Sequence, residues 1–66
     1  MPNPIIKHFG YLHLPQHLHE VVKPFQELAV KMDRDLFDGP EKSAGLRKLL
    51  EAKDCMVRAT LPHPEE

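Results

Sequence analysis

The chain has 66 residues, enough for one domain, and its charges nearly balance, with 9 basic and 10 acidic side chains and a net charge of −1. This balance argues against a protein that binds DNA or RNA through a basic surface. The sequence has neither an apolar run near the roughly 20 residues of a membrane span nor the apolar core of a secretory signal, so we expect a cytoplasmic protein.

The first segment, residues 1–15, is predicted to form an N-terminal arm. It holds three of the seven prolines, which lack a backbone N–H, so we expect an extended arm rather than a helix. Phe9 and Tyr11 stand on either side of Gly10, which permits a sharp bend of the backbone. One possibility is that both rings pack over the helices that follow, and this is the expected role of Phe9. The alternative for Tyr11 is that its ring forms a stacking platform for a ligand.

Residues 16–37 carry the pattern of an amphipathic helix. Its apolar positions recur at spacings of three and four residues: Leu18, Val21, Val22, Phe25, Leu28, Ala29, Met32 and Leu36. Pro24 lies inside this pattern and removes one backbone donor, which predicts a kink. Because the apolar stripe passes through Pro24 without losing phase, we expect one kinked helix.

An Asp-Gly-Pro sequence then predicts the end of this helix and the start of a second one over residues 40–60. Asp38 is expected to cap the second helix, Pro40 fits its first turn, and Glu41 stands at the capping-box distance from Asp38. One side of this helix carries small and apolar residues: Gly45, Leu49, Ala52, Met56 and Ala59.

Together these elements predict an all-α fold, in which the arm precedes an antiparallel helical hairpin domain over residues 16–60 and a flexible tail covers residues 61–66. A hairpin of this size buries too little apolar surface to be stable alone. Cys55 is the sole cysteine, so no disulfide within the chain compensates. The surplus apolar surface of the second helix therefore predicts a homo-oligomer.

Residue patterns for catalysis and metal binding are weak. His13, His17 and His19 lie close together, but Pro15 separates the first two, and no cysteine or carboxylate stands at a ligand spacing. Ser43 lies near a helix start, where serine commonly bonds to the local backbone. We therefore expect no metal, no cofactor and no enzymatic activity.

The aromatic arm is the stronger candidate for ligand binding. An aromatic ring beside a lysine or arginine can hold a base by stacking and its phosphate by charge. Tyr11 supplies the ring, and Lys7, Lys23 and Arg58 are candidates for the charge.

The stretch DGPEKSAGLRKLLEAKD, residues 38–54, resembles the helical-hairpin proteins with which phages sequester cyclic-nucleotide immune signals. The resemblance covers roughly residues 9–60. It rests on an aromatic arm with a nearby histidine, a Leu-Ala pair and a Glu-Lys-Ser turn: Phe9, Gly10, Tyr11, His13, Leu28, Ala29, Glu41, Lys42, Ser43, Ala44, Leu46, Leu49 and Ala52.

The resemblance implies a phage protein that binds cyclic oligonucleotides of the bacterial CBASS defence without cleaving them, so that the host effector is never activated. The implied ligands are cyclic dinucleotides such as cGAMP, with cyclic trinucleotides as a second class. Members of this family assemble as oligomers, from dimers to hexamers, with ligands between subunits.

The resemblance also implies a set of site residues. A tyrosine of the arm stacks on a base, and Tyr11 matches it; a lysine of the first helix contacts the ligand, but its position falls on Gln26, with Lys23 one turn earlier. The expected ligand-binding residues are Phe9, Gly10, Tyr11, His13, Lys23 and Gln26. Apart from the resemblance, Lys42, Ser43 and Arg58 are the candidates to line a second pocket, whose existence the sequence leaves open.

Two alternative functions stay open. Relatives with the same hairpin bind cyclic ADP-ribose signals of the Thoeris defence, and Gln26 in place of lysine is compatible with that ligand. A hairpin that only binds other proteins is the third hypothesis, and it predicts apolar surface left over after self-association.

Overall fold

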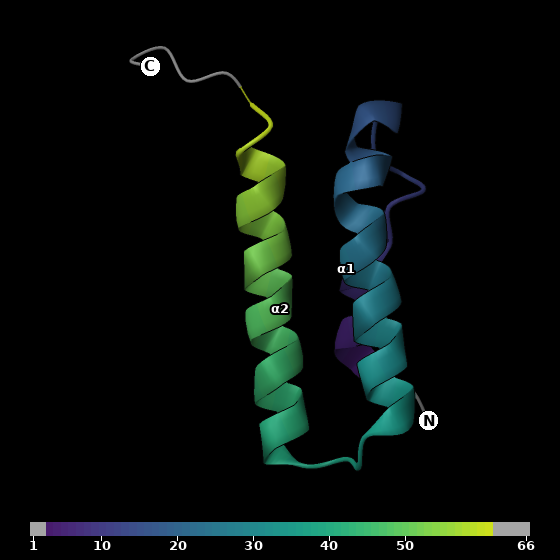
Figure 1. Ribbon diagram of the computed structural model, residues 1–66, viewed down its shortest axis with the longest axis vertical. Coiled ribbons are helices and arrows are strands. Elements are labelled where there is room, and N and C mark those ends of the chain that lie inside the picture. The colour runs from purple at the N-terminus through teal and green to yellow at the C-terminus, as the bar shows by residue number, and fades with distance from the viewer. Residues whose placement is uncertain (1–2, 62–66) are drawn as a thin grey trace.

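The computed structural model describes residues 3–61, and that part of the chain is all-helical, without strands. A 3-10 helix, η1, covers Pro4–Phe9, and two long helices follow, α1 over Gln16–Asp35 and α2 over Pro40–Arg58. The long helices lie antiparallel, and η1 packs behind α1 with contacts to both (Figure 1). The predicted hairpin is confirmed, although each helix ends slightly earlier than predicted. Across the described residues no helix has the length and apolar character that a bilayer crossing requires.

The N-terminal segment differs from the extended arm that the prolines predict. Pro4 stands in the first turn of η1, where the fixed φ of proline suits a helix and its missing N–H costs nothing. The Asn3 side chain caps this turn by accepting a hydrogen bond from the Ile5 N–H at 3.1 Å. Gly10 ends η1 in an ordinary extended conformation (φ −62°, ψ 147°), so the bend that a glycine permits is not used there.

Helix α1 passes through Pro24 without a break, which confirms one helix rather than two. Pro24 is exposed, and the buried residues of the helix, Leu18, Val22 and Ala29, all belong to the predicted apolar stripe. Burial of that stripe holds the helix together where proline removes one backbone hydrogen bond.

The predicted capping of α2 by Asp38 is wrong. Gly39 is the N-cap residue, and within residues 3–61 no side chain makes a capping hydrogen bond to α2. The Asp38 carboxylate instead accepts a hydrogen bond from the Lys42 ammonium group, one turn into the helix. Pro40 occupies the first turn, as predicted. An ammonium group is a stronger partner for a carboxylate than a backbone N–H is, so the capping box does not form.

The core lies where η1 meets the two long helices. Phe9 and Ala29 are fully buried and Leu46 is 3% exposed, which gives each element one buried residue in a common cluster. Partly buried side chains surround this cluster: Ile5, Ile6, Phe25, Leu49 and Leu50. Leu46 is the single buried residue of α2 within the described chain, and Met56, at 51%, is the large apolar side chain of that helix that stays exposed.

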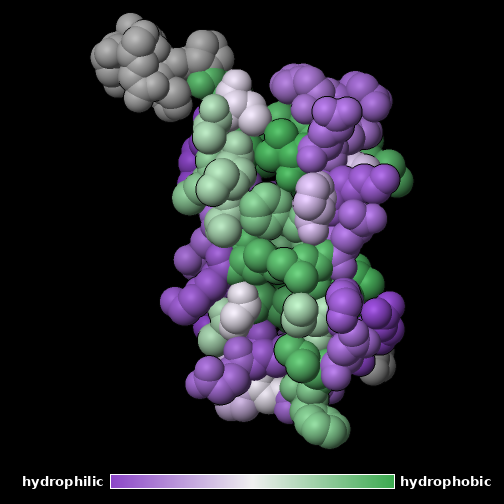
Figure 2. Space-filling view, in the orientation of Figure 1, coloured by the Kyte–Doolittle hydropathy of each residue, from purple (hydrophilic) through white to green (hydrophobic). Residues whose placement is uncertain are grey.

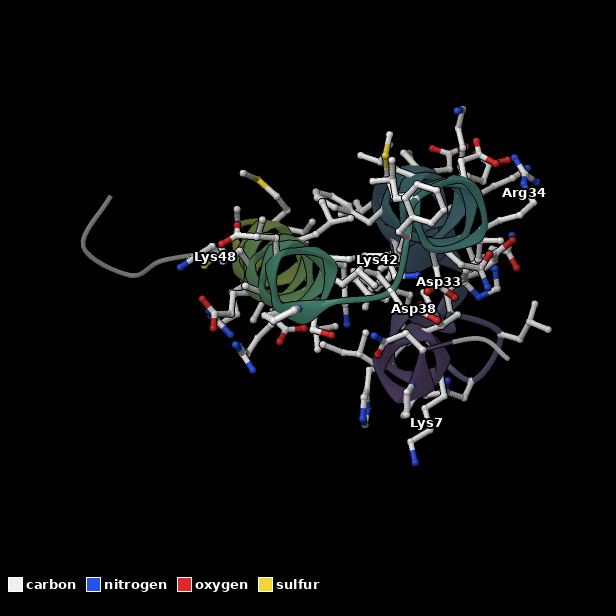
Figure 3. All side chains as sticks on the ribbon, turned by 90° about the horizontal axis from the view of Figure 1, so that it is seen from below. Lys7, Asp33, Arg34, Asp38, Lys42 and Lys48 are labelled. Atoms are coloured by element: carbon white, nitrogen blue, oxygen red, sulfur yellow. The ribbon has the colours of Figure 1, made fainter. Side chains whose placement is uncertain are left out.

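A polar cluster closes the end of the hairpin, where the labelled side chains of Asp33, Asp38 and Lys42 gather (Figure 3). Lys42, whose side chain is 5% exposed, forms an ion pair with Asp33 Oδ1 at 2.9 Å and donates hydrogen bonds to the Asp33 and Leu36 carbonyl oxygens. The ion pair lacks hydrogen-bond geometry, which leaves Asp33 Oδ1 without a donor among the described residues. The Asn3 backbone N–H donates to Asp33 Oδ2 at 2.9 Å, so the cluster joins η1 to both long helices.

This cluster predicts a loss of stability in acid. The hydrogen bond from the Asn3 N–H, and after it the neighbouring Lys42 ammonium group, lower the pKa of Asp33 below its ordinary value of 3.8. A carboxyl group with a lowered folded-state pKa stabilises the fold above its unfolded pKa, and this contribution disappears as the pH falls through the folded pKa. We therefore expect Asp33→Asn to be less stable than wild type at neutral pH, with a difference that narrows below about pH 4.

Denaturant unfolding between pH 2 and pH 7 measures this difference. Asp54→Asn is the matched control, because among residues 3–61 Asp54 pairs with its sequence neighbour Lys53 alone and is half exposed. A constant difference between Asp33→Asn and wild type over the whole pH range would contradict the assigned role of Asp33.

Candidate functional site

Tyr11 lies just after η1 and is half-buried against the start of α1. Its ring meets the His19 imidazole edge to face, with ring centroids 5.1 Å apart and planes at 65°. His19 Nε2 lies 2.9 Å from the Leu14 carbonyl oxygen, to which it donates in the tautomer that carries its proton on Nε2. His19 therefore holds both the Tyr11 ring and the segment that carries it.

A shallow hollow of about 270 Å³ opens beside Tyr11. Its other lining residues are Gln16, His19, Glu20 and Lys23. His19 and Glu20 each lie three or four residues from both Gln16 and Lys23, so the four share one side of α1. The hollow thus combines a ring face, an ammonium group, a carboxylate and an amide. Such a set can stack a base, attract a phosphate and bond to the polar edge of a base or sugar.

Tyr11 and Lys23, two of the predicted ligand-binding residues, are brought together in this hollow. Gln26 is half-buried and His13 is exposed, and neither belongs to the part of the described surface that lines the hollow. Of the two candidate positions on α1, Lys23 lines the hollow and Gln26 does not.

Phe9 and Gly10 were expected to bind the ligand, but neither lines the hollow among the described residues. Phe9 is 0% exposed in the cluster with Ala29 and Leu46, so its ring has no face open to a ligand, and its packing role is confirmed. Gly10 is half-buried and lies outside the set that lines the hollow of the described chain. Both residues act indirectly, by placing Tyr11 at the end of η1.

Within one chain, the three candidate residues of the second pocket are not brought together. Lys42 is engaged by Asp33 and Asp38, and Ser43 accepts a hydrogen bond from the Asn3 side chain at 3.3 Å. Arg58 lies at the other end of α2, about 24 Å away at the usual rise of about 1.5 Å per residue. Its guanidinium group contacts Cys55 Sγ at 3.3 Å.

Sequence reasoning missed Gln16, Glu20 and the structural role of His19, which it considered only as a metal ligand. The signal that identifies them is their spacing from Lys23, because residues seven, four and three positions before it share its helix face. Among residues 3–61 no three metal-ligating side chains come together, so His19 is described by its contacts with Tyr11 and Leu14.

Comparisons of the chain with protein-family models, with curated proteins and with solved structures found no match. The features of the protein that bear on its function are the hollow beside Tyr11 and the exposed apolar side chains of the hairpin.

Proposed function

We propose that this protein is a self-associating helical hairpin that binds a cyclic oligonucleotide signal and sequesters it unchanged. The observation that supports this function is the hollow in which the Tyr11 ring and the Lys23 ammonium group stand together. Stacking on an aromatic ring stabilises a bound base by about 1–3 kcal/mol, and the lysine attracts the adjoining phosphate. Sequestration requires binding alone, so the proposal includes no catalytic residue, metal or cofactor.

The ligand is proposed to lie between two copies of the chain. A hollow of about 270 Å³ is smaller than the roughly 300–1,000 Å³ of typical small-molecule sites. A cyclic dinucleotide carries two bases and two phosphates, and two copies related by a two-fold axis supply one Tyr11 and one Lys23 for each half. Self-association therefore completes a site that one hairpin supplies only in part.

The face opposite η1 is the proposed surface for this association. Figure 2 shows apolar side chains running along the junction of α1 and α2 on this face. Leu28 of α1 and Met56 of α2 are 42% and 51% exposed. Gly45 and Ala52 share the Met56 side of α2 and allow close helix approach, as in a four-helix bundle built from two hairpins.

The test is isothermal titration of the full chain with a panel of cyclic dinucleotides, cyclic trinucleotides and cyclic ADP-ribose isomers. We expect one class to bind with a dissociation constant on the order of 1 nM, about −12 kcal/mol, at one ligand for two chains. Mass spectrometry of the released ligand should show it unchanged. No heat from a folded protein across the panel, or conversion of the ligand, would contradict the proposal.

The panel also distinguishes two further functions. Exclusive binding of a cyclic ADP-ribose isomer would make the protein a sponge for that signal instead. A hairpin that binds only proteins is favoured by Leu12 and Phe37, which are 85% and 97% exposed. That function predicts no binding of any small molecule in the panel.

Removal of the His19 ring is expected to weaken ligand binding without unfolding the chain. Edge-to-face aromatic contacts contribute about 0.5–1.5 kcal/mol, so His19→Ala should lower affinity by about twofold to tenfold through a looser Tyr11. Tyr11 is the sole tyrosine and the chain has no tryptophan, so its fluorescence anisotropy reports its mobility directly. His17→Ala, which changes an exposed histidine outside the hollow, is the control. Unchanged anisotropy and affinity in His19→Ala would contradict this role.

A further inference from the structure

The end of the hairpin at which α1 passes into α2 exposes apolar side chains. Phe37 is 97% exposed, Leu36 52% and Val30 42%. These three residues, together with Ile6 of η1, line a groove of about 610 Å³, the larger of the two hollows described for residues 3–61. An exposed phenylalanine therefore stands directly beside an apolar groove of its own chain.

Charged residues of both signs complete the groove. Asp33 and Lys42 are paired with each other inside the fold, and Lys42 also pairs with Asp38. The side chains of Arg34 and Asp38 are nevertheless 68% and 81% exposed, so both charges remain open to a partner. Figure 3, which views this end from below, shows Arg34 at the outer side of α1 and Asp38 near the middle of the molecule. The Arg34 Nε and Nη2 atoms contact Asp35, and its Nη1 makes no hydrogen bond within the described chain.

We propose that a second copy of this chain docks on this surface across a two-fold axis, with Phe37 of each copy inserted into the groove of the other. A two-fold contact requires one surface that complements itself. This surface complements itself in two ways. Phe37 stands at the groove, so each copy offers both an aromatic ring and a place for one, and Arg34 and Asp38 carry opposite charges. A partner of one charge sign would find like charges here, whereas a second copy brings each Arg34 to the other copy's Asp38.

This contact is distinct from the association proposed above. It lies at the turn between the helices, whereas the surface with Leu28 and Met56 runs along their length. It also needs no ligand, so it stands whether or not the protein binds a cyclic nucleotide. Two different two-fold contacts on one chain build assemblies larger than a dimer.

Sedimentation velocity of the full, ligand-free chain over a concentration series tests the proposal. We expect Phe37→Ser to weaken one association step by at least about tenfold, as removal of a central aromatic anchor does. Because Phe37 is exposed, its circular dichroism spectrum should match wild type. Leu12→Ser removes an equally exposed apolar side chain elsewhere and should leave the association unchanged. A monomeric wild type, or identical association of Phe37→Ser and wild type, would overturn the proposal.

Discussion

Phe9→Ala is expected to leave this protein largely unfolded at room temperature. Phe9 is 0% exposed and joins η1 to Ala29 of α1 and Leu46 of α2. Truncation of a buried phenylalanine costs about 3–5 kcal/mol, through lost transfer free energy and the cavity that remains. The core of so small a domain rarely supplies more than about 3–5 kcal/mol, so one substitution removes most of it.

Far-UV circular dichroism during thermal unfolding, at one fixed protein concentration, measures the effect of Phe9→Ala. Leu12→Ala is the control, because it truncates a large apolar side chain that is 85% exposed and lies outside the proposed contact of Phe37. Phe9→Leu keeps most of the buried volume and should unfold between Phe9→Ala and wild type. A melting temperature of Phe9→Ala close to that of the Leu12→Ala control would contradict the placement of Phe9 in the core.

Tyr11→Ala is expected to weaken binding of the proposed cyclic-nucleotide ligand severely while the fold survives. Each stacked base contributes about 1–3 kcal/mol, and a site between two copies contains two Tyr11 rings. Loss of both rings therefore removes about 2–6 kcal/mol, which weakens binding by roughly 30-fold to more than 10,000-fold. Tyr11 is only half-buried and lies outside the core cluster, so the helices should remain.

Isothermal titration and far-UV circular dichroism together check this second result. Tyr11→Phe keeps the ring and should bind within a few-fold of wild type, whereas Lys23→Met keeps the ring but loses the charge, so its affinity should become less dependent on salt. His13→Ala changes a neighbouring exposed residue outside the hollow and should bind normally. Wild-type affinity in Tyr11→Ala would move the binding site away from this hollow.

The two long helices could be predicted from sequence because their signals are local. The apolar stripe of α1 repeats every three or four residues and passes through Pro24 in phase, and Pro40 marks the start of α2. Helical periodicity and the turn chemistry of proline depend on neighbours within about one turn, so no knowledge of distant contacts is needed.

The roles within the arm were decided by tertiary contacts. Phe9 and Tyr11 are both aromatic and two residues apart, yet one lies in the core and the other lines the hollow. The difference arises because η1 forms and packs on both long helices, which turns Phe9 inward. Proline content alone predicted an extended arm, since it does not reveal that Asn3 will cap a helical turn.

The roles of the charged residues were likewise decided by tertiary contacts. Sequence alone identifies Lys42 as a helix residue near a turn, where it is equally suited to bind a ligand or to pair with a carboxylate. The hairpin brings Asp33, nine positions earlier, within 2.9 Å of its ammonium group and uses that charge for stability. Lys23 has no such partner among residues 3–61 and stays beside Tyr11. The sequence by itself thus determined the two helices and their apolar stripes, because helix formation is governed by short-range periodicity. Which side chains are buried, paired or left for a ligand depended on contacts between residues far apart in the chain, and only the tertiary structure decided it.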